Sequence, residues 1–403
     1  MLEGHQDVFW PPVTGWLIAL IRLAAGSDSI APVRAAWIVM DTACAAGVYA
    51  LARRLGGSLW GADRDRAGRL ARASTLIYAL YLPAISHAQF ATSEIPALLA
   101  TLVTLLLVTA QGAGLRHYLC GGVMAGVACL TRPSLLPLLV LVPLAATARL
   151  GAVGRRKAIA FAAVGSCVVG AHVARNWYYA GEATIATNSA YNLFIGNRDM
   201  YAEDLNLFSP RATPEQIEYR RRQFSAELPP FTQTPSESQR LGLQAITDHP
   251  LRFARRAVGR LARVFVPKTD VLELTGGSAR VSVYAPSSIV LLIAANVEWA
   301  LMLFGGFTGL AMLYRRDRDW ARLFAGVIGG ALVLCLIAIS KPRYSFVFDP
   351  LLIICATVLW IERRHAATLL TRIDRRVVAA WCAFVLWGWV AFAIFAVTSR
   401  SAL

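Results

Sequence analysis

Apolar runs close to membrane-spanning length alternate with short polar segments along most of this chain. A helix needs about 20 predominantly apolar residues to cross a bilayer. The pattern therefore predicts an all-α polytopic membrane protein with about ten transmembrane helices. The predicted spans lie near 32–52, 73–90, 94–111, 117–132, 134–150, 158–175, 286–313, 323–340, 346–361 and 377–397.

Two segments depart from this alternation. Residues 11–26 begin with two prolines and are short for a full crossing, so they predict an interfacial helix. Residues 176–285 form the one long polar stretch, within which residues 240–266 have the periodicity of an amphipathic helix with a basic second half. The predicted regions are an N-terminal membrane region (1–175), a long mixed extracytoplasmic loop (176–285) and a C-terminal membrane region (286–403).

The basic residues predict the orientation. With the spans above, the basic clusters all fall on one side of the membrane, in the loops 53–72, 155–157, 315–322 and 363–376. Cytoplasmic loops carry an excess of Lys and Arg, so this side is predicted to be cytoplasmic. The opposite side then receives 1–31, 92–94, 132–133, 176–285 and 341–344. We expect an integral protein of the bacterial inner (plasma) membrane with its active site on the extracytoplasmic side.

Composition agrees with this class. The chain is 57% hydrophobic and 16% charged, whereas soluble domains are about 45–50% apolar and about 25% charged. The net charge of +16 is explained by arginines in short loops, so no nucleic-acid partner is expected. The 7 cysteines lie in apolar runs, and neither they nor the 6 histidines have metal-ligand spacing. No cofactor is predicted with certainty, and a divalent metal is left open.

Polar residues at the predicted outer boundary are the candidates for chemistry, because ionisable groups in membranes are costly and often functional. Glu94 begins a span after a very short outer turn, where it could act as a base, orient an acceptor, bind a cation or simply cap the helix. Arg132, Arg175 and Arg343 lie at the same boundary, and Tyr344 follows Arg343. A guanidinium there either binds a phosphate or extends to the lipid headgroups.

A polar and aromatic segment, residues 187–197, follows the sixth predicted span. Asn188, Tyr191 and Asn192 supply the amides and the ring that often hold sugars. The alternative is an ordinary extracytoplasmic loop with Asn and Gly at its turns.

Several short motifs occur in the order and spacing of a known family. They are Phe9-Trp-Pro-Pro12, Tyr49–Gly56, Thr92-Ser-Glu94, Leu130-Thr-Arg-Pro133, Arg175-Asn176, Asn188–Asn197, Asp248-His-Pro250 and Arg343-Tyr344. With them, the chain from about residue 9 to about residue 360 resembles polytopic glycosyltransferases of the GT-C class, of the kind related to protein O-mannosyltransferases and aminoarabinose transferases.

The resemblance implies an inverting transfer of a sugar from a polyprenyl-phosphate carrier to a lipid, glycan or protein acceptor outside the cytoplasm. Arg132, Arg175 and Arg343 would then bind the carrier phosphate and stabilise charge on the leaving group. Tyr191 and Tyr344 would line the donor site, and Asn188 and Asn192 would contact the sugar or the loop backbone.

The chain departs from the family at the catalytic base, an acidic residue in the first outer loop after the first span. No predicted span precedes residue 11, and Glu3 and Asp7 are the only acids before it. A gene model truncated at its N-terminus and a divergent or inactive enzyme both explain this. We therefore consider Glu94 and Asp7 as the candidate bases.

Two other functions share this topology. A transporter or flippase for a lipid-linked glycan would favour several ionisable residues inside spans, where Asp41 is the clearest acid. A polymerase or ligase of surface polysaccharide would share the outer arginines. The long outer loop favours sugar transfer.

Overall fold

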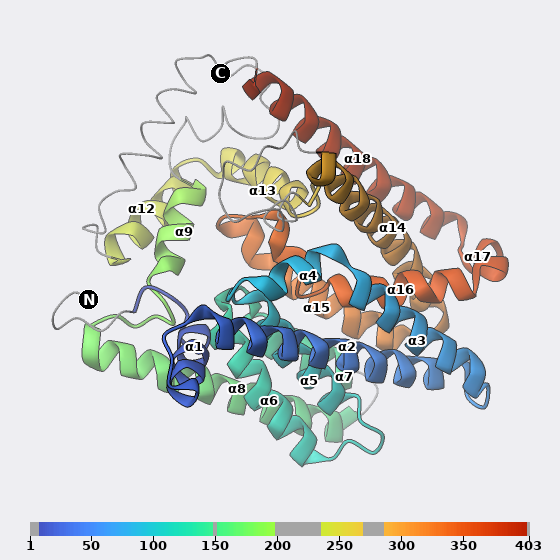
Figure 1. Cartoon of the computed structure of the whole chain (residues 1–403), viewed down its shortest axis with the longest axis horizontal. Coiled ribbons are helices and arrows are strands. Elements are labelled where there is room, and N and C mark those ends of the chain that lie inside the picture. Colours follow the sequence, from blue (N-terminus) through green and yellow to red (C-terminus); the bar gives the residue numbers. More distant parts are fainter. Residues whose placement is uncertain (1–7, 148–150, 198–234, 269–285, 401–403) are drawn as a thin grey trace.

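The computed structural model describes residues 8–147, 151–197, 235–268 and 286–400. Within these ranges the regular elements are all helices, which confirms the predicted all-α class for this part of the chain (Figure 1). Asp7 lies outside the described residues.

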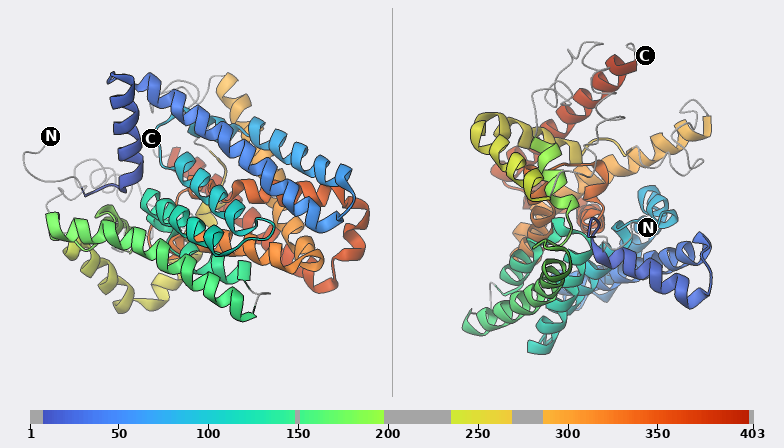
Figure 2. Two further views of the ribbon diagram at one scale, coloured as in Figure 1. Left: turned by 90° about the horizontal axis from the view of Figure 1, so that it is seen from below. Right: turned by 90° about the vertical axis from the view of Figure 1, so that its left-hand side faces the viewer.

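The N-terminal membrane region is a succession of helices joined by short turns. In chain order they are α1 (Pro12–Ala25), α2 (Ile30–Trp60), α3 (Arg64–Leu80), α4 (Leu82–Gln89), α5 (Glu94–Val108), α6 (Leu115–Thr131), η1 (Pro133–Leu135), α7 (Leu138–Thr147) and α8 (Gly151–Ala180). Long α2 and α3 run side by side, and α1 meets the start of α2 at a steep angle (Figure 2, left).

In the described part of the predicted outer loop the helices are α9 (Asn188–Asn197), α12 (Pro235–Asp248) and α13 (Pro250–Val264). The C-terminal membrane region contains α14 (Pro286–Arg316), α15 (Arg318–Ile337), η3 (Pro342–Ser345), α16 (Asp349–Ile361), α17 (Arg363–Leu369) and α18 (Arg372–Arg400). Helix α14 packs along α16, and α9 packs against α12.

Among the residues that the structure describes, five helices are long and apolar enough to cross a membrane. They are Ile30–Trp60, Val153–Ala180, Ile289–Arg316, Arg318–Ile337 and Asp374–Ala393. Large apolar side chains on these helices are exposed, as expected of surfaces that face lipid; Val39, Leu301 and Val390 are examples. The structure thus supports an integral membrane protein, while the number of ten spans stays a prediction.

The predicted span 73–90 is wrong as a single helix, because the chain breaks at Tyr81. Helix α3 ends at Leu80 and α4 begins at Leu82, with Pro83 in its first turn. A proline inside a continuous helix would remove one backbone hydrogen bond and clash with the preceding turn. Helix α4 then meets α5 at a bend of 117°, so these two form either a broken span or a re-entrant loop.

The predicted outer segments are also more divided than expected. The sugar-binding candidate 187–197 is largely helical, as α9. The amphipathic helix predicted over 240–266 is two helices, α12 and α13, separated at His249 where Pro250 begins α13. The basic second half corresponds to α13, which carries five arginines.

Glycines allow the closest helix contacts in the membrane region. A Cβ atom at Gly309 of α14 would lie 2.0 Å from the backbone oxygen of Cys355 in α16. At Gly122 of α6 it would lie 2.4 Å from the backbone oxygen of Phe161 in α8. Such small-residue approaches are common where helices pack in membranes, since the gain comes from van der Waals contact.

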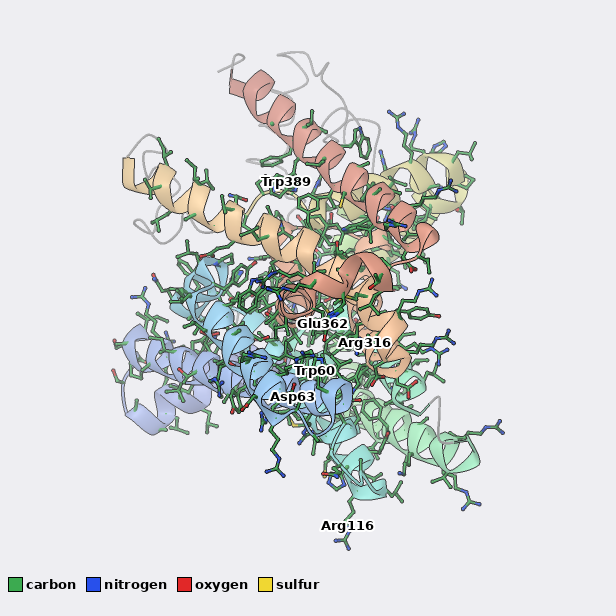
Figure 3. All side chains as sticks on the ribbon, turned by 90° about the vertical axis from the view of Figure 1, so that its right-hand side faces the viewer. Trp60, Asp63, Arg116, Arg316, Glu362 and Trp389 are labelled. Atoms are coloured by element: carbon green, nitrogen blue, oxygen red, sulfur yellow. The ribbon has the colours of Figure 1, made fainter. Side chains whose placement is uncertain are left out.

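Residues from the predicted cytoplasmic loops gather around Glu362, which is 2% exposed. Trp60 donates to Glu362 over 2.6 Å, and Arg316 lies 3.0 Å from its carboxylate. Arg66 adds a longer ion pair at 3.9 Å, and Trp60, Arg316 and Glu362 lie together in Figure 3. Three of the four loops that are predicted to be cytoplasmic therefore contribute residues to this contact.

Candidate functional site

Three turns that the sequence placed on the outer face converge on the carboxylate of Glu94. Arg132 Nη1 lies 2.7 Å and Arg343 Nε 3.4 Å from the same oxygen, Oε1. Glu94 and Arg132 are buried, at 2% and 8% exposed, whereas the Arg343 side chain is 40% exposed. Two of the three candidate arginines, Arg132 and Arg343, therefore lie beside Glu94, which the sequence alone could not show.

Local sequence explains how these side chains reach one another. Glu94 is the first residue of α5, where the helix dipole favours a carboxylate. Arg132 has left α6 with φ −142° and ψ 106°, because the following Pro133 disfavours the helical conformation. The turn before Glu94 is fastened to α2, since Trp37 Nε1 donates to the Thr92 carbonyl over 2.9 Å.

The turn η3 supplies the third member and an aromatic neighbour. The Arg132 guanidinium carbon lies 5.0 Å from the centroid of the Tyr344 ring, a cation–π contact. Burial raises the pKa of Tyr344 above its ordinary value, so its hydroxyl stays protonated and can donate at neutral pH. The group combines two guanidiniums with one carboxylate, so it has an excess positive charge, and its more accessible cation is Arg343.

This geometry bears on the role of Glu94. Its carboxylate is already compensated by two guanidiniums, and it is almost inaccessible to solvent. Both features suit a residue that orients the arginines. Its predicted role as base or acceptor orienter stays a prediction, as does that of Asp7.

Sequence reasoning missed a second buried ionic group beside the same turn. Lys268 Nζ lies 3.5 Å from Asp349 Oδ2, and Tyr81 donates to the same oxygen over 3.0 Å. Asp349 was included in the predicted span 346–361, and an acid in an apolar run was the signal that could have identified it. Lys268 offered no such signal, because it follows the amphipathic segment like an ordinary boundary lysine.

Arg175 and its neighbour organise the chain after α8. Arg175 donates to the Asn176 side chain over 3.0 Å and lies over the Tyr179 ring at 5.7 Å. Asn176 is 1% exposed and donates to the carbonyl of Thr184 over 2.8 Å. The contribution of Arg175 to carrier-phosphate binding stays a prediction.

The predicted sugar-contact residues lie at the start and middle of α9. The backbone N–H of Asn188 donates to the Phe9 carbonyl over 3.1 Å, and the Tyr191 ring lies 6.4 Å from the Phe9 ring. Asn188, Tyr191 and Asn192 are all half-buried. Their contact with a sugar stays a prediction.

A hollow of about 380 Å³ lies between α9, α12 and α13. Its lining includes Phe194 and Asn197 of α9 together with Arg252 and Phe253 of α13, and it does not include Asn188, Tyr191 or Asn192. The residues of α9 that face this hollow are therefore not those that the sequence singled out.

Two arginines of α13 turn inward and bind the ends of other helices. Arg260 is 6% exposed and donates to the carbonyls of Gly196 and Leu336, both over 2.7 Å. Arg256 donates to the Asn197 carbonyl over 2.8 Å. Burial, with the charges of neighbouring arginines, lowers the pKa of Arg260 to about 10, which still leaves it charged at neutral pH.

No group of three or more His, Cys, Asp or Glu side chains suited to a metal occurs among the residues that the structure describes. The side chains of the Glu94 group supply guanidinium, carboxylate and phenol groups.

Comparison with known proteins finds a family that the N-terminal part of the chain resembles. Residues 10–177 match the family described as dolichyl-phosphate-mannose-protein mannosyltransferase. Searches of curated proteins and of solved structures gave no match. The family match supports the resemblance to GT-C mannosyltransferases over residues 10–177 and indicates a membrane glycosyltransferase.

Proposed function

We propose that this chain, whose residues 10–177 match a mannosyltransferase family, moves a sugar from a polyprenyl-phosphate carrier to an extracytoplasmic acceptor. The observation that carries the proposal is the group formed by Glu94, Arg132 and Arg343. Two of its members lie inside the matched region, and the fold brings the third to them from the C-terminal membrane region.

The chemistry of the donor explains why such a group is useful. In an inverting transfer, the acceptor oxygen forms a bond to the anomeric carbon while the bond from that carbon to the carrier phosphate breaks. The acceptor loses a proton to a base, and the carrier leaves as a phosphate monoester with increased negative charge. Donors already aimed at that developing charge lower the barrier.

Arg343 is the residue best placed to meet the carrier phosphate. Its guanidinium is partly exposed, and it is oriented by the Glu94 carboxylate on its inner side. A planar guanidinium group can donate two parallel hydrogen bonds to the oxygens of a phosphate. Arg132 is buried and ion-paired, so its charge would act over a longer distance, and Tyr344 would donate from its neutral hydroxyl.

Two competing functions lead to different products. A flippase would move the intact sugar lipid across the bilayer, so the bond between sugar and phosphate would survive. A polymerase or ligase would transfer a glycan from a lipid carrier to another glycan or lipid. The family match favours the transfer of a single sugar from a polyprenyl phosphate.

The test is transfer of radiolabelled mannose from a polyprenyl phosphate by the purified protein in liposomes, with envelope lipids, glycans and peptides as acceptors. We expect Arg343→Ala to lower the rate by on the order of 10²–10³-fold, the usual loss on removing a donor aimed at developing charge. Arg343→Lys keeps the charge but not the planar fork, so it should restore only part of the rate. Glu94→Gln, which removes the carboxylate that orients Arg132 and Arg343, should abolish transfer.

A matched control is Arg116→Ala, which removes an exposed arginine that points away from the helices in Figure 3. This variant should transfer at the wild-type rate. Wild-type rates in both Glu94→Gln and Arg343→Ala would overturn the assigned roles. Recovery of intact donor on the opposite leaflet, with no free polyprenyl phosphate, would support a flippase.

A further inference from the structure

A buried ion pair between Lys268 and Asp349 contacts the turn that carries Arg343. Lys268 is 2% exposed and Asp349 is 0% exposed, and their charged atoms are 3.5 Å apart. Burying two charges costs several kcal/mol each before their attraction is counted. The pair therefore requires a reason beyond packing.

The donors of Lys268 are directed at both ends of that turn. Its ammonium donates to the Pro342 carbonyl over 2.8 Å and to the Ser345 hydroxyl. These are the first and last residues of η3, and Arg343 and Tyr344 lie between them. One ammonium group therefore bridges the two ends of the segment that presents Arg343 to Glu94.

Lys268 is itself held firmly by α14. Its backbone N–H donates to Asn296 Oδ1 over 2.7 Å, and its ammonium lies 4.1 Å from the centroid of the Trp299 ring. Tyr81, at the break between α3 and α4, fixes the Asp349 carboxylate from the other side. The turn is thus positioned by contacts from α14, α16 and the α3–α4 junction.

We propose that Lys268 is a positioning residue for Arg343. Its ammonium holds the backbone of Pro342–Ser345 in the shape that directs the Arg343 guanidinium to the phosphate of a lipid-linked sugar. The proposal rests on the proposed function, since that function gives Arg343 its ligand. Lys268 itself does not touch the substrate.

The decisive variant is Lys268→Met, which keeps an unbranched chain against Trp299 and removes the charge and all three donors. The turn loses its bridge, and Arg343 no longer has a fixed direction. A misplacement of about 1 Å costs on the order of 10²-fold in rate, so we expect kcat/KM for the sugar lipid to fall tenfold or more. Because Arg343 also binds the phosphate of the substrate, part of this loss should appear as a rise in KM. Lys268→Arg should recover part of this loss, since it can still donate to the turn.

Lys157→Met is a matched control. Lys157 makes the same two kinds of contact at a site remote in sequence, donating to the Ala113 carbonyl over 2.6 Å and lying 5.5 Å from the Tyr118 ring centroid. Its loss removes an ammonium, a hydrogen bond and a cation–π contact without affecting η3. The KM of this variant should stay within twofold of wild type.

The effect must pass through Arg343, which a double variant tests. In an Arg343→Ala background, Lys268→Met should change transfer by less than twofold, because residues that act through one another are not additive. Elution of each variant as a single peak in detergent would establish folding. If Lys268→Met does not fold, Ser345→Ala removes one contact of the bridge, and its KM should still rise.

The outcomes separate the two proposals. An unchanged KM in Lys268→Met, or the same fold loss with and without Arg343, would overturn the positioning role while leaving the function in place. Wild-type transfer by Arg343→Ala, or no transfer by the wild-type protein, would overturn the function and this inference with it.

Discussion

Glu94→Gln should destabilise the folded protein because it leaves a buried cation without its partner. The Arg132 guanidinium is 8% exposed and lies 2.7 Å from the carboxylate oxygen that the substitution neutralises. Removing one partner of a buried ion pair costs about 3–5 kcal/mol. Arg343 also loses its carboxylate, but its side chain is 40% exposed and water can replace part of that contact.

The geometry also predicts an order among variants. Arg132→Gln leaves Glu94 with Arg343 at 3.4 Å, so it should cost less than Glu94→Gln. The double variant Glu94→Gln/Arg132→Gln has no unpaired buried charge from this pair. It should therefore be more stable than the sum of the single losses predicts, by about 0.5–3 kcal/mol, the range for residues in direct contact.

Unfolding by sodium dodecyl sulfate in mixed micelles, followed by tryptophan fluorescence, measures these free energies on one scale. Arg116→Ala provides a control for the loss of an exposed arginine, and it should stay near wild-type stability. Additive losses within about 0.5 kcal/mol, or a smaller loss for Glu94→Gln than for Arg132→Gln, would contradict the ion pair as described.

Two further predictions concern contacts away from the candidate site. Gly309→Ala would place a methyl group 2.0 Å from the Cys355 backbone oxygen, so α14 and α16 would have to separate. We expect the free energy of unfolding to fall by about 1–3 kcal/mol in the same assay. An unchanged value would contradict this packing. Burial by itself would raise the pKa of Glu362, but the hydrogen bond from Trp60 and the charge of Arg316 lower it below its ordinary value of 4.5. The stabilisation from ionised Glu362 is therefore complete above pH 4.5, and it is lost as the pH falls through the lower pKa of the folded protein. The free energy of unfolding of a Glu362→Gln variant should therefore differ most from that of the wild type at neutral pH and least in acid.

Hydrophobic periodicity was sufficient to predict an all-α membrane protein, because a helix in lipid forms all of its backbone hydrogen bonds within its own segment. It did not predict the break at Tyr81, since the run 73–90 is mostly apolar and contains no Asp, Glu, Lys or Arg, so that only Pro83 indicates an interruption. The helical form of α9 was also missed. Its Asn and Gly residues have low helix propensity, and packing against α12 outweighs that preference.

The candidate site was partly accessible to sequence reasoning. Glu94, Arg132 and Arg343 could be placed at one boundary by topology, because turns between successive spans alternate between the two faces. Their mutual distances depend on how helices pack, which the spacing along the chain does not contain. Lys268 and Asp349 were missed for the same reason, as they are 81 residues apart and meet only through the arrangement of α14 and α16.

The inward-facing arginines of α13 have a mechanical consequence. Arg260 binds the last turns of α9 and α15 at the same time, through the carbonyls of Gly196 and Leu336. Neither helix can shift away without leaving a buried cation and several carbonyls unsatisfied. Helix α9 is thereby coupled to α15, a helix long and apolar enough to cross a membrane, whose end leads within five residues to the turn η3. A force applied to α9 would thus be transmitted to the backbone that carries Arg343.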